Sequence, residues 1–345
     1  MRRWLGWTLG ALILSIPGSG VPHAVTPPIP PAVRTWTHRE PIEIGARETA
    51  RGVVLLPAPE IEGGENAAIT HFEMDLVDED GRPLRSDGVM LHHVVVMNYG
   101  NSLVGSGSRR DATCSSFAAS SSWQWAPAWA ERFFSRGAER STLEFPEGYG
   151  YRLARGDRWS AFYMLMSHGN RDERVYLQYT VTWVTRAQAA GMQFARLLWL
   201  DVRNCRVDPV YSIAGGGTED TQTFDFTLPE SGRLVSGMGH LHSGGKRLEL
   251  REPDCDDREV FRSLPTWSDP DEAPERMSGF TSSSGIPVAK GQRLRLASIY
   301  DAVHPHADVM GIMGVMFVPD PGVTPAVACG ALPILSPLHD TNEVP

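Results

Sequence analysis

The stretch "RVYLQYTVTWV", residues 174–184, decides the fold class of this chain. Large apolar side chains occupy every second position, namely Val175, Leu177, Tyr179, Val181 and Trp183. Because successive side chains of a β-strand point to opposite faces, a period of two predicts a strand with one buried face. A helix would instead repeat its apolar positions every three or four residues. This stretch is therefore predicted to be a half-buried strand.

The same alternation recurs along the chain, in segments separated by Gly-, Pro- and Asp-containing turns. These segments are "ITHFEMDLV" (69–77), "TQTFDFTLP" (221–229), "KRLELRE" (246–252) and "QRLRLASIY" (292–300). Many short strands with frequent turns are typical of antiparallel sandwiches and jelly rolls. We therefore predict an all-β fold with two antiparallel jelly-roll β-sandwich domains. Their expected ranges are residues 41–187 and 188–330, with a boundary in "TRAQAAGM" (185–192).

Composition excludes one class of partner. The chain has 345 residues and a formal net charge of −9 at pH 7, and its Lys and Arg residues form no run. Nucleic-acid-binding proteins carry clustered positive charge that neutralises phosphates. We therefore expect no nucleic-acid partner.

The N-terminus resembles an export signal. Arg2 and Arg3 precede an apolar run over residues 4–16, which is too short to span a bilayer. We expect a signal peptide over residues 1–24, a Pro-rich linker over 25–40 and a C-terminal tail over 331–345. No later segment is apolar for long enough to cross a membrane, so the mature chain is expected to be secreted or extracytoplasmic and without a membrane span.

Cysteine usage agrees with an oxidising compartment. The four cysteines are widely spaced and form no CxxC motif: Cys114, Cys205, Cys255 and Cys329. An even number of cysteines in an exported protein predicts two disulfides, for which three pairings are possible.

Histidine spacing suggests metal chemistry. In "SGMGHLHSGG" (236–245), His240 and His242 are two residues apart, so a strand would present both imidazoles on one face. His92 and His93 are adjacent and would point to opposite faces of a regular strand, so to share an ion they need a strand end, a β-bulge or the use of different ring nitrogens. His168 follows the apolar segment "YMLM". Two sets of ligands are thus conceivable.

A methionine beside these histidines indicates copper. Met310 lies in "DAVHPHADVMGIMGVMFVPD", and thioether sulfur is a soft ligand that favours copper, whereas imidazole accepts both copper oxidation states. His304 and His306, which precede Met310, are a rival pair for the same ion. The proline between them disfavours a regular strand, so a loop at the edge of a cleft is expected.

The order of these residues resembles the copper type II, ascorbate-dependent monooxygenases, the family of peptidylglycine alpha-hydroxylating and dopamine beta-monooxygenases. The resemblance runs roughly from Val53 to Pro319. The motifs "GHLHSGG" and "DVMGIMGVMFV" look closer still to the stress up-regulated nodulin family. The resemblance implies two jelly-roll domains with one copper each, facing a solvent-filled cleft.

Ligands and activity follow from the same resemblance. It implies that the first copper is held by His92, His93 and His168, and the second, O2-binding copper by His240, His242 and Met310. The implied reaction is hydroxylation of a C–H bond of a small-molecule substrate, with O2 and with ascorbate or a similar reductant.

Some positions depart from the peptide-amidating branch. Where that branch places an Arg, an Asn and a Tyr to bind the substrate carboxylate, this chain has Met238, Ile312 and Gly314. The family has a cysteine directly after the ligand methionine, and this chain has Gly311 there. At the position of that cysteine's disulfide partner, this chain has Ser298. Peptide amidation is therefore disfavoured, and the substrate class stays open.

Three other readings of the histidines remain. The chain could hold copper for storage or stress response without turnover. A zinc hydrolase could use His92, His93 and His168 with an open water position, although no HExxH motif provides a general base. The histidines could also be incidental to a structural jelly roll.

Overall fold

A computed structural model describes residues 33–61, 67–84, 88–101, 113, 130–139, 142–185, 187–205, 209–267 and 273–338. The expected signal peptide over residues 1–24 and Cys114 lie outside these residues. The description below concerns the described ranges, which belong to one compact unit beginning at Ala32.

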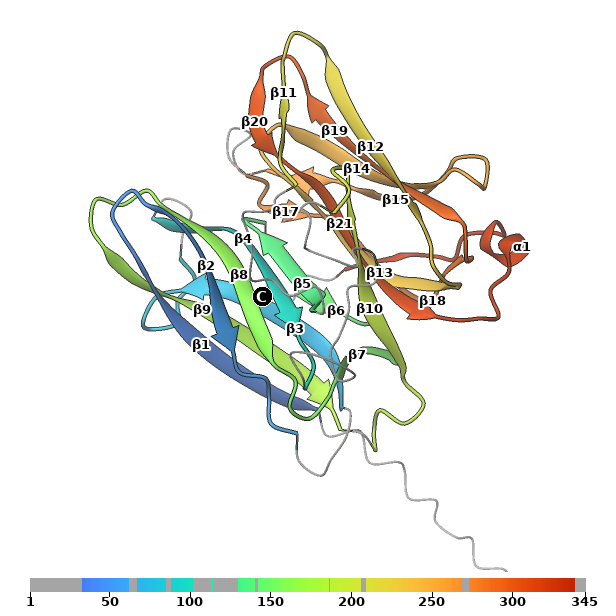
Figure 1. The fold of residues 1–345 in the computed structure, drawn as a ribbon, viewed down its shortest axis with the longest axis horizontal. Coiled ribbons are helices and arrows are strands. Elements are labelled where there is room, and N and C mark those ends of the chain that lie inside the picture. The colour runs from blue at the N-terminus through green and yellow to red at the C-terminus, as the bar shows by residue number, and fades with distance from the viewer. Residues whose placement is uncertain are drawn as a thin grey trace, which may run out of the picture. The chain divides into compact units, whose positions relative to one another are not determined.

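The first β-sandwich is built around the strand that contains the alternating stretch 174–184 (Figure 1). That strand, β9 (Glu173–Val184), pairs antiparallel with β1 (Arg34–Ile44) on one side and β3 (Ala67–Val77) on the other. β3 also pairs with β6 (Thr142–Glu144) and β7 (Tyr149–Leu153). The predicted strand is confirmed, and its alternating apolar residues are buried in the first core.

A second sheet covers the buried face of these strands. Its order is β2 (Thr49–Leu56), β8 (Trp159–Ser167), β4 (Val89–Asn98) and β5 (Glu131–Gly137). Trp159, Phe72 and Tyr179 fill the space between the two sheets and contact one another through their rings. Aromatic packing of this kind buries large apolar surfaces, which is the main stabilising term in a β-sandwich.

The second β-sandwich follows β10 (Gln193–Asp201). One sheet continues through β21 (Gly311–Pro319), β13 (Gly232–Leu241), β18 (Gly279–Val288) and β22 (Ser336–Pro337). The opposing sheet has the order β12 (Glu219–Thr227), β19 (Arg293–Asp301), β14 (Gly245–Glu252) and β15 (Arg258–Ser263).

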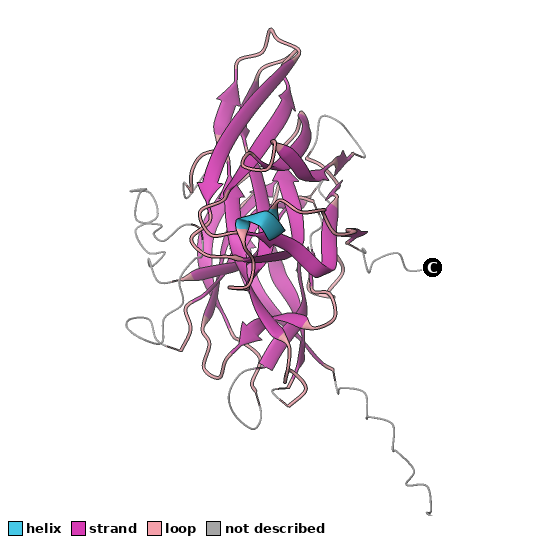
Figure 2. Cartoon of the chain, turned by 90° about the vertical axis from the view of Figure 1, so that its right-hand side faces the viewer, coloured by secondary structure: helices cyan, strands magenta, loops and turns pink. Residues whose placement is uncertain are grey.

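Two short ladders and one helix complete the described elements. The ladders pair β11 (Tyr211–Ile213) with β20 (His306–Val309), and β16 (Pro265–Thr266) with β17 (Arg276–Met277). The helix is α1 (Pro325–Ala328), and strands dominate the rest (Figure 2).

One sheet runs through both sandwiches, because β10 pairs in parallel with β7 and antiparallel with β21. The strands after this junction are buried on both faces. Met313 and Leu198 point into the second core, whereas Met316, Leu197 and Trp199 point into the first. Alternate residues of β10, β21 and β13 therefore face the first sandwich, and this geometry positions the histidines described below.

The predicted all-β class with two antiparallel jelly-roll β-sandwiches is confirmed, with the parallel β7–β10 pair as its one departure in the described sheets. The ordered sheet begins at Arg34, inside the segment expected as a linker, and β22 lies in the expected tail. In the part of the chain that the structure describes, no helix is long and apolar enough to cross a membrane.

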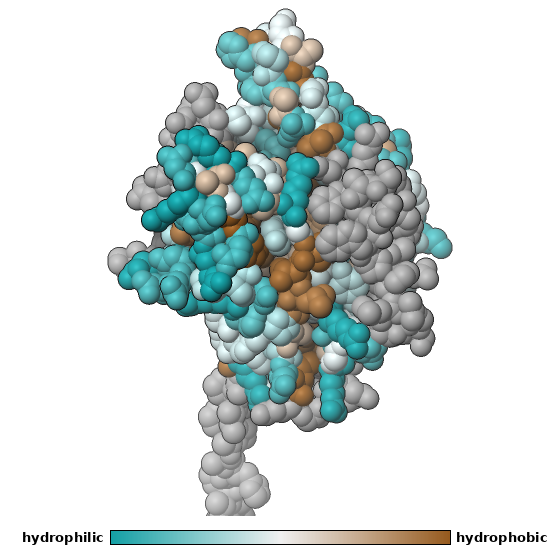
Figure 3. All heavy atoms as spheres, turned by 60° about the vertical axis from the view of Figure 1, so that its left-hand side comes forward, coloured by the Kyte–Doolittle hydropathy of each residue, from teal (hydrophilic) through white to brown (hydrophobic). Residues whose placement is uncertain are grey.

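The surface and the disulfides agree with this architecture. Figure 3 shows a face on which hydrophilic residues predominate, while hydrophobic residues gather in a narrow central area. Cys255 and Cys329 form a disulfide across a sequence separation of 74 residues. Cys205 is also disulfide-bonded.

Candidate metal centre

Glycine and strand alternation set the direction of His240 and His242. A Cβ added at Gly239 would lie 2.6 Å from the Leu248 side chain, so the absence of a side chain lets β13 lie close to β14. Side chains of β13 alternate between the two faces of the sheet. His240 and His242 therefore lie on the face opposite to Gly239 and point toward the first sandwich. The H-x-H pair is presented on one face, as its spacing predicts.

A β-bulge orients the adjacent pair. In the ladder between β4 and β8, Leu91 pairs with Leu165 and His93 with Met164, which leaves His92 as the extra residue. A bulge re-aims a side chain that a regular strand would send to the opposite face. The bulge thus allows His92 and His93 to lie together, with their Nδ1 atoms 3.1 Å apart.

The two pairs meet in one place, which we call the histidine cluster (His92, His93, His240 and His242). The ring centroids of His92 and His93 are 5.2 Å apart. The His242 ring lies 5.0 Å from His92 and 5.0 Å from His240. The cluster therefore joins the two sandwiches through direct contact between imidazole rings.

Each histidine of the H-x-H pair has one ring nitrogen engaged and one unpartnered. His240 Nδ1 lies 2.8 Å from the Glu139 carboxylate, and the His242 ring forms a hydrogen bond with the backbone of Asp308. The Nε2 atoms of both rings are buried without a hydrogen-bond partner. A buried, unsatisfied polar atom is costly unless a ligand occupies it. Metal-binding histidines show this pattern, with one nitrogen held by a carboxylate or carbonyl and the other on the metal.

Met310 lies beside the H-x-H pair. His240 pairs with Ile312 and Leu241 with Gly311, so continuing this register places Met310 opposite His242. The buried Tyr300 hydroxyl accepts a hydrogen bond from His242 N at 2.8 Å and donates one to Met310 O at 2.5 Å. Met310 and His240 line the same cavity. The structure thus brings the predicted second set of ligands onto one face.

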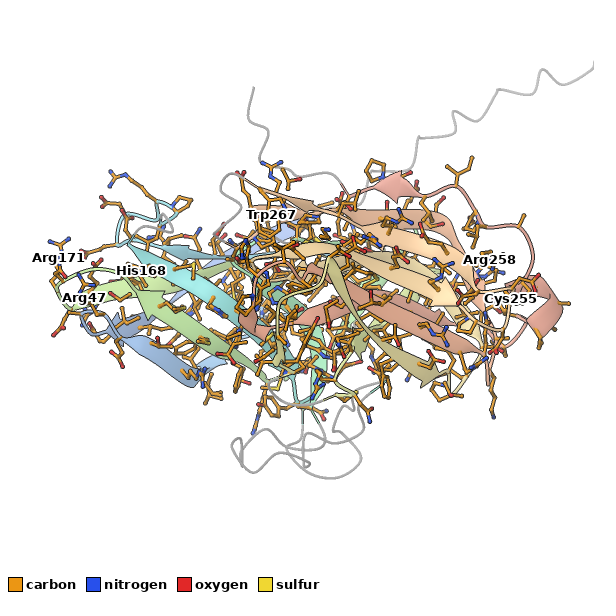
Figure 4. All side chains as sticks on the ribbon, turned by 90° about the horizontal axis from the view of Figure 1, so that it is seen from above. Arg47, His168, Arg171, Cys255, Arg258 and Trp267 are labelled. Carbon is orange, nitrogen blue, oxygen red and sulfur yellow. A yellow bond between two sulfur atoms is a disulfide. The ribbon has the colours of Figure 1, made fainter. Side chains whose placement is uncertain are left out.

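His168 does not join the histidine cluster. It follows β8, is exposed, and its backbone N–H donates to Gly88 O at 2.9 Å. Figure 4 shows it with Arg47 and Arg171 at one end of the first sandwich. Gly88 lies just before β4 and four residues before His92. Since strands rise about 3.3 Å per residue, the backbone that His168 contacts is roughly 13 Å from His92 along the chain direction.

Of the rival pair His304 and His306, one residue lies at the surface and the other lies near the site. His304 is exposed, whereas His306 begins β20 and packs its ring against Gly244. The His306 Nε2 atom is buried without a hydrogen-bond partner and lies 4.0 Å from an oxygen of Asp301. His306 therefore lies near the site as a further imidazole.

Two hollows border the histidine cluster. An open cleft of about 950 Å³ is lined by His92, His168, His242 and His306 among others. A smaller cavity of about 100 Å³ lies between β4–β5 and the β10–β21–β13 layer. His240 and Glu139 line both hollows. The cluster is thus accessible from solvent on one side and faces an apolar space on the other.

No complete metal site of the usual kind is preformed. Among the described residues, no group of three or more His, Cys, Asp or Glu side chains is arranged to hold a metal ion. A site of two histidines and a methionine contains only two such side chains, so it is compatible with that finding. The donor set around His240 and His242 fits a soft metal such as copper better than zinc, because a thioether is a poor zinc ligand.

Burial keeps the imidazoles of His92, His93 and His242 neutral. Burial, together with the neighbouring His240, lowers the pKa of His92 from 6.5 to about 4. Burial and the adjacent His92 lower the pKa of His93 to about 3. The pKa of His242 is also well below its usual value, again mainly because of burial. Neutral imidazoles are the metal-binding form.

These pKa values predict that the metal-free protein loses stability in mild acid. Below about pH 6.5, the unfolded chain binds protons that buried His92 and His93 do not, so the free energy of unfolding falls with pH. We expect it to be about 2–3 kcal/mol lower at pH 5.5 than at pH 7. Urea unfolding in a chelator measures this change. The His92→Gln variant should reduce this difference by about half, because it removes one of the two histidines.

Glu139 is the site residue that sequence reasoning missed. It follows β5, its side chain is 1% exposed, and its Oε1 atom accepts hydrogen bonds from Gly137 N and from His240. Its Oε2 atom is buried without a hydrogen-bond partner. Nothing in "FFSRGAER" marks this glutamate, because its partner is contributed by β13, far along the chain.

The positions that depart from the amidating enzymes cluster around the same cavity. Met238, Ile312 and Gly314 all line it, next to His240 and Met310. A Cβ added at Gly311 would lie 2.3 Å from both Cβ and Oγ of Ser298. Gly311 and Ser298 therefore face each other, at a spacing shorter than the roughly 3.8 Å between the Cβ atoms of a disulfide.

Comparisons with known proteins add little. No protein-family model and no curated protein matches the chain. Solved structures that are weakly similar include the STIV MCP, at 8% identity and a TM-score of 0.37, covering 84% of this chain and 97% of that chain. They also include T=3 Penaeus vannamei nodavirus, at 10% identity and a TM-score of 0.19, covering 92% and 99% of the two chains. Infectious bursal disease virus Gx strain follows, at 9% identity and a TM-score of 0.19, with 86% and 74% covered.

Proposed function

We propose that this protein is a two-copper monooxygenase-like protein that hydroxylates a C–H bond of a small substrate. One observation carries the proposal: His240 and His242 each have one ring nitrogen bonded within the protein and a buried, unpartnered Nε2. Met310 lies on the same face. Two imidazoles and a thioether form a ligand set suited to copper in both oxidation states. The facing positions Gly311 and Ser298 are further support for the register of the family resemblance.

The reaction balances with a reductant of the ascorbate class. A substrate C–H bond breaks and a C–O bond forms with one atom of O2, and the second oxygen atom leaves as water. Two electrons and two protons come from the reductant. Bound copper would supply O2 activation and one-electron steps, which no side chain of the chain can perform alone.

The chain's own residues would hold and shape this site. Glu139 and the Asp308 backbone fix the orientation of the His240 and His242 rings. Tyr300 ties the His242 backbone to the Met310 backbone, so the two ligand segments keep one spacing. His92 and His93 would bind the second ion from the cleft side, and ring contact with His242 brings the two ligand pairs together. His168 lines the same cleft, from which it would have to approach.

Copper titration tests the proposal. Purified protein should bind two equivalents of copper, with a Cu(II) EPR signal that disappears when ascorbate is added. With substrate present, ascorbate should drive O2 consumption. Binding of two coppers without substrate-dependent O2 consumption would favour the non-catalytic copper-binding alternative. Tight binding of zinc without copper would overturn both readings.

Glu139 is expected to act as a positioning residue for His240. Glu139→Gln keeps an oxygen acceptor but removes the charge, and it should weaken copper binding by about 10-fold. Glu139→Ala removes the acceptor and should weaken binding by up to about 100-fold. Competition with a chelator measures affinity, and nitrogen hyperfine splitting in EPR reports the ring orientation. Unchanged affinity and splitting in both variants would rule this role out.

A further inference from the structure

The cavity beside the histidine cluster is built from both sandwiches and is mainly apolar. β4 and β5 contribute one wall, with Met97 and Phe134. β10, β13 and β21 contribute the other, with Trp199, Met238 and Met316. Methionine side chains adapt their shape to different ligands, and they are common at apolar binding surfaces. The walls therefore suit a hydrocarbon-rich molecule.

The two arginines on the wall each have a partner within the protein, and Arg136 also keeps a buried Nε atom without a hydrogen bond. Arg136 donates to Met74 O and pairs with the Asp75 carboxylate. The Arg132 guanidinium carbon lies 4.2 Å from the centroid of the Trp199 ring. A charged ligand would lose its hydration here without gaining a free counter-charge, which is strongly unfavourable. The occupant is therefore expected to be uncharged.

Glu139 gives the cavity an acidic, hydrogen-bond-accepting end. Glu139 is almost completely buried, and its Oε2 atom has no hydrogen-bond partner. Because a carboxylate oxygen only accepts hydrogen bonds, it would favour a ligand with a single donor such as a hydroxyl group. This end is next to His240, so a donor bound there would be close to the proposed ligands.

The volume limits the size of the occupant. The cavity measures about 100 Å³. A dry apolar cavity of about 150 Å³ binds benzene in another protein. The space is therefore smaller than a benzene-binding cavity, and it fits a short branched chain rather than a ring.

From these observations we propose that the cavity binds a small, uncharged, hydrocarbon-rich molecule that has at most one hydroxyl donor, and that this molecule belongs to the substrate class. Its role as substrate rests on the proposed function; its binding does not. Met238, Ile312 and Gly314 offer no donor to a carboxylate, and the charge of Arg136 is already paired with Asp75, so the cavity disfavours carboxylates.

Isobutanol is the probe, and the metal-free protein in a chelator is the sample. With methionine methyl groups labelled with ¹³C, the signals of Met97, Met238, Met310 and Met316 should shift in a saturable way. Those of Met74 and Met313, which do not line the cavity, should stay in place. Isobutyrate and isobutylammonium, which have similar shapes, should bind at least 10-fold more weakly.

Variants assign the binding to the cavity. Gly314 has an ordinary strand conformation, and a Cβ added there would lie 3.2 Å from Leu197, so Gly314→Ala should weaken binding and Gly314→Val should abolish it. Val315→Ala is the matched control, since Val315 points into the second core. It should lose stability without losing binding.

Three results would overturn the proposal: no methyl shift up to the solubility limit, charged probes that bind as well as isobutanol, or unchanged binding in both Gly314 variants. Because the experiment contains no metal, it separates the two proposals. If isobutanol binds but the protein takes up no copper, the binding cavity stands and the proposed copper chemistry fails. If copper binds but no apolar ligand does, the copper site stands and the cavity proposal fails.

Discussion

Replacing His242 with alanine is expected to reduce bound copper from two equivalents to one. His242 contributes a buried, unpartnered Nε2 atom, and its removal leaves His240 and Met310 as an incomplete ligand set. The loss of a direct ligand should exceed the 10- to 100-fold effect that is typical of outer-shell partners, so the affinity should fall by more than about 100-fold. Copper content after desalting, measured by mass spectrometry, gives the stoichiometry directly.

The control and the alternative outcomes are equally specific. His71→Ala removes a histidine that pairs with Glu73 outside the cluster, and it should retain two equivalents. Unchanged stoichiometry in His242→Ala would overturn the ligand assignment. Loss of both ions would show that the histidine cluster acts as one site, which its ring contacts make structurally possible.

Removing the Cys255–Cys329 disulfide is expected to lower the free energy of unfolding by about 3–5 kcal/mol. The bond closes a loop across a sequence separation of 74 residues, and a loop of this length loses much chain entropy when it is cross-linked in the unfolded state. The double serine variant can be measured by denaturant unfolding under conditions that keep the other cysteines oxidised.

Local contacts in the folded protein will determine how much smaller the loss in free energy of unfolding is than the loss expected from chain entropy alone. Arg258, which pairs with Glu252, also donates to the carbonyl of Ala328 next to Cys329, so the segment keeps one anchor without the bond. Copper stoichiometry should remain at two, because these residues lie outside both hollows beside the histidine cluster. A change below about 1 kcal/mol would show that this anchor suffices.

The fold was largely readable from local patterns. Alternation in residues 174–184 predicted a strand because the period of two survives whatever partner the strand finds. The extent of the sheet was not readable. β7 and β10 pair in parallel across the boundary between the sandwiches, and such pairing depends on how distant strands pack rather than on either sequence.

The histidine site, like the fold, was only partly predictable from the sequence. The spacing of His240 and His242 determined that they share a face, because side-chain direction in a strand follows from position alone. The proximity of His92 to His242 could not be predicted from spacing. It requires a bulge in β4 and the contact of two sandwiches. His168 illustrates the limit, since its position at the end of an apolar strand says nothing about which neighbours that end will have.

By itself, the sequence determined the strand-rich class, the orientation of the H-x-H pair and the chemical nature of the candidate ligands, because these depend on local geometry and on side-chain chemistry. Only the tertiary structure decided that four histidines meet, that buried Glu139 holds His240, and that Met238, Ile312 and Gly314 enclose one apolar cavity. These contacts join residues far apart in the chain. Their formation depends on the packing of β4 and β5 against the β10–β21–β13 layer, which no local pattern encodes.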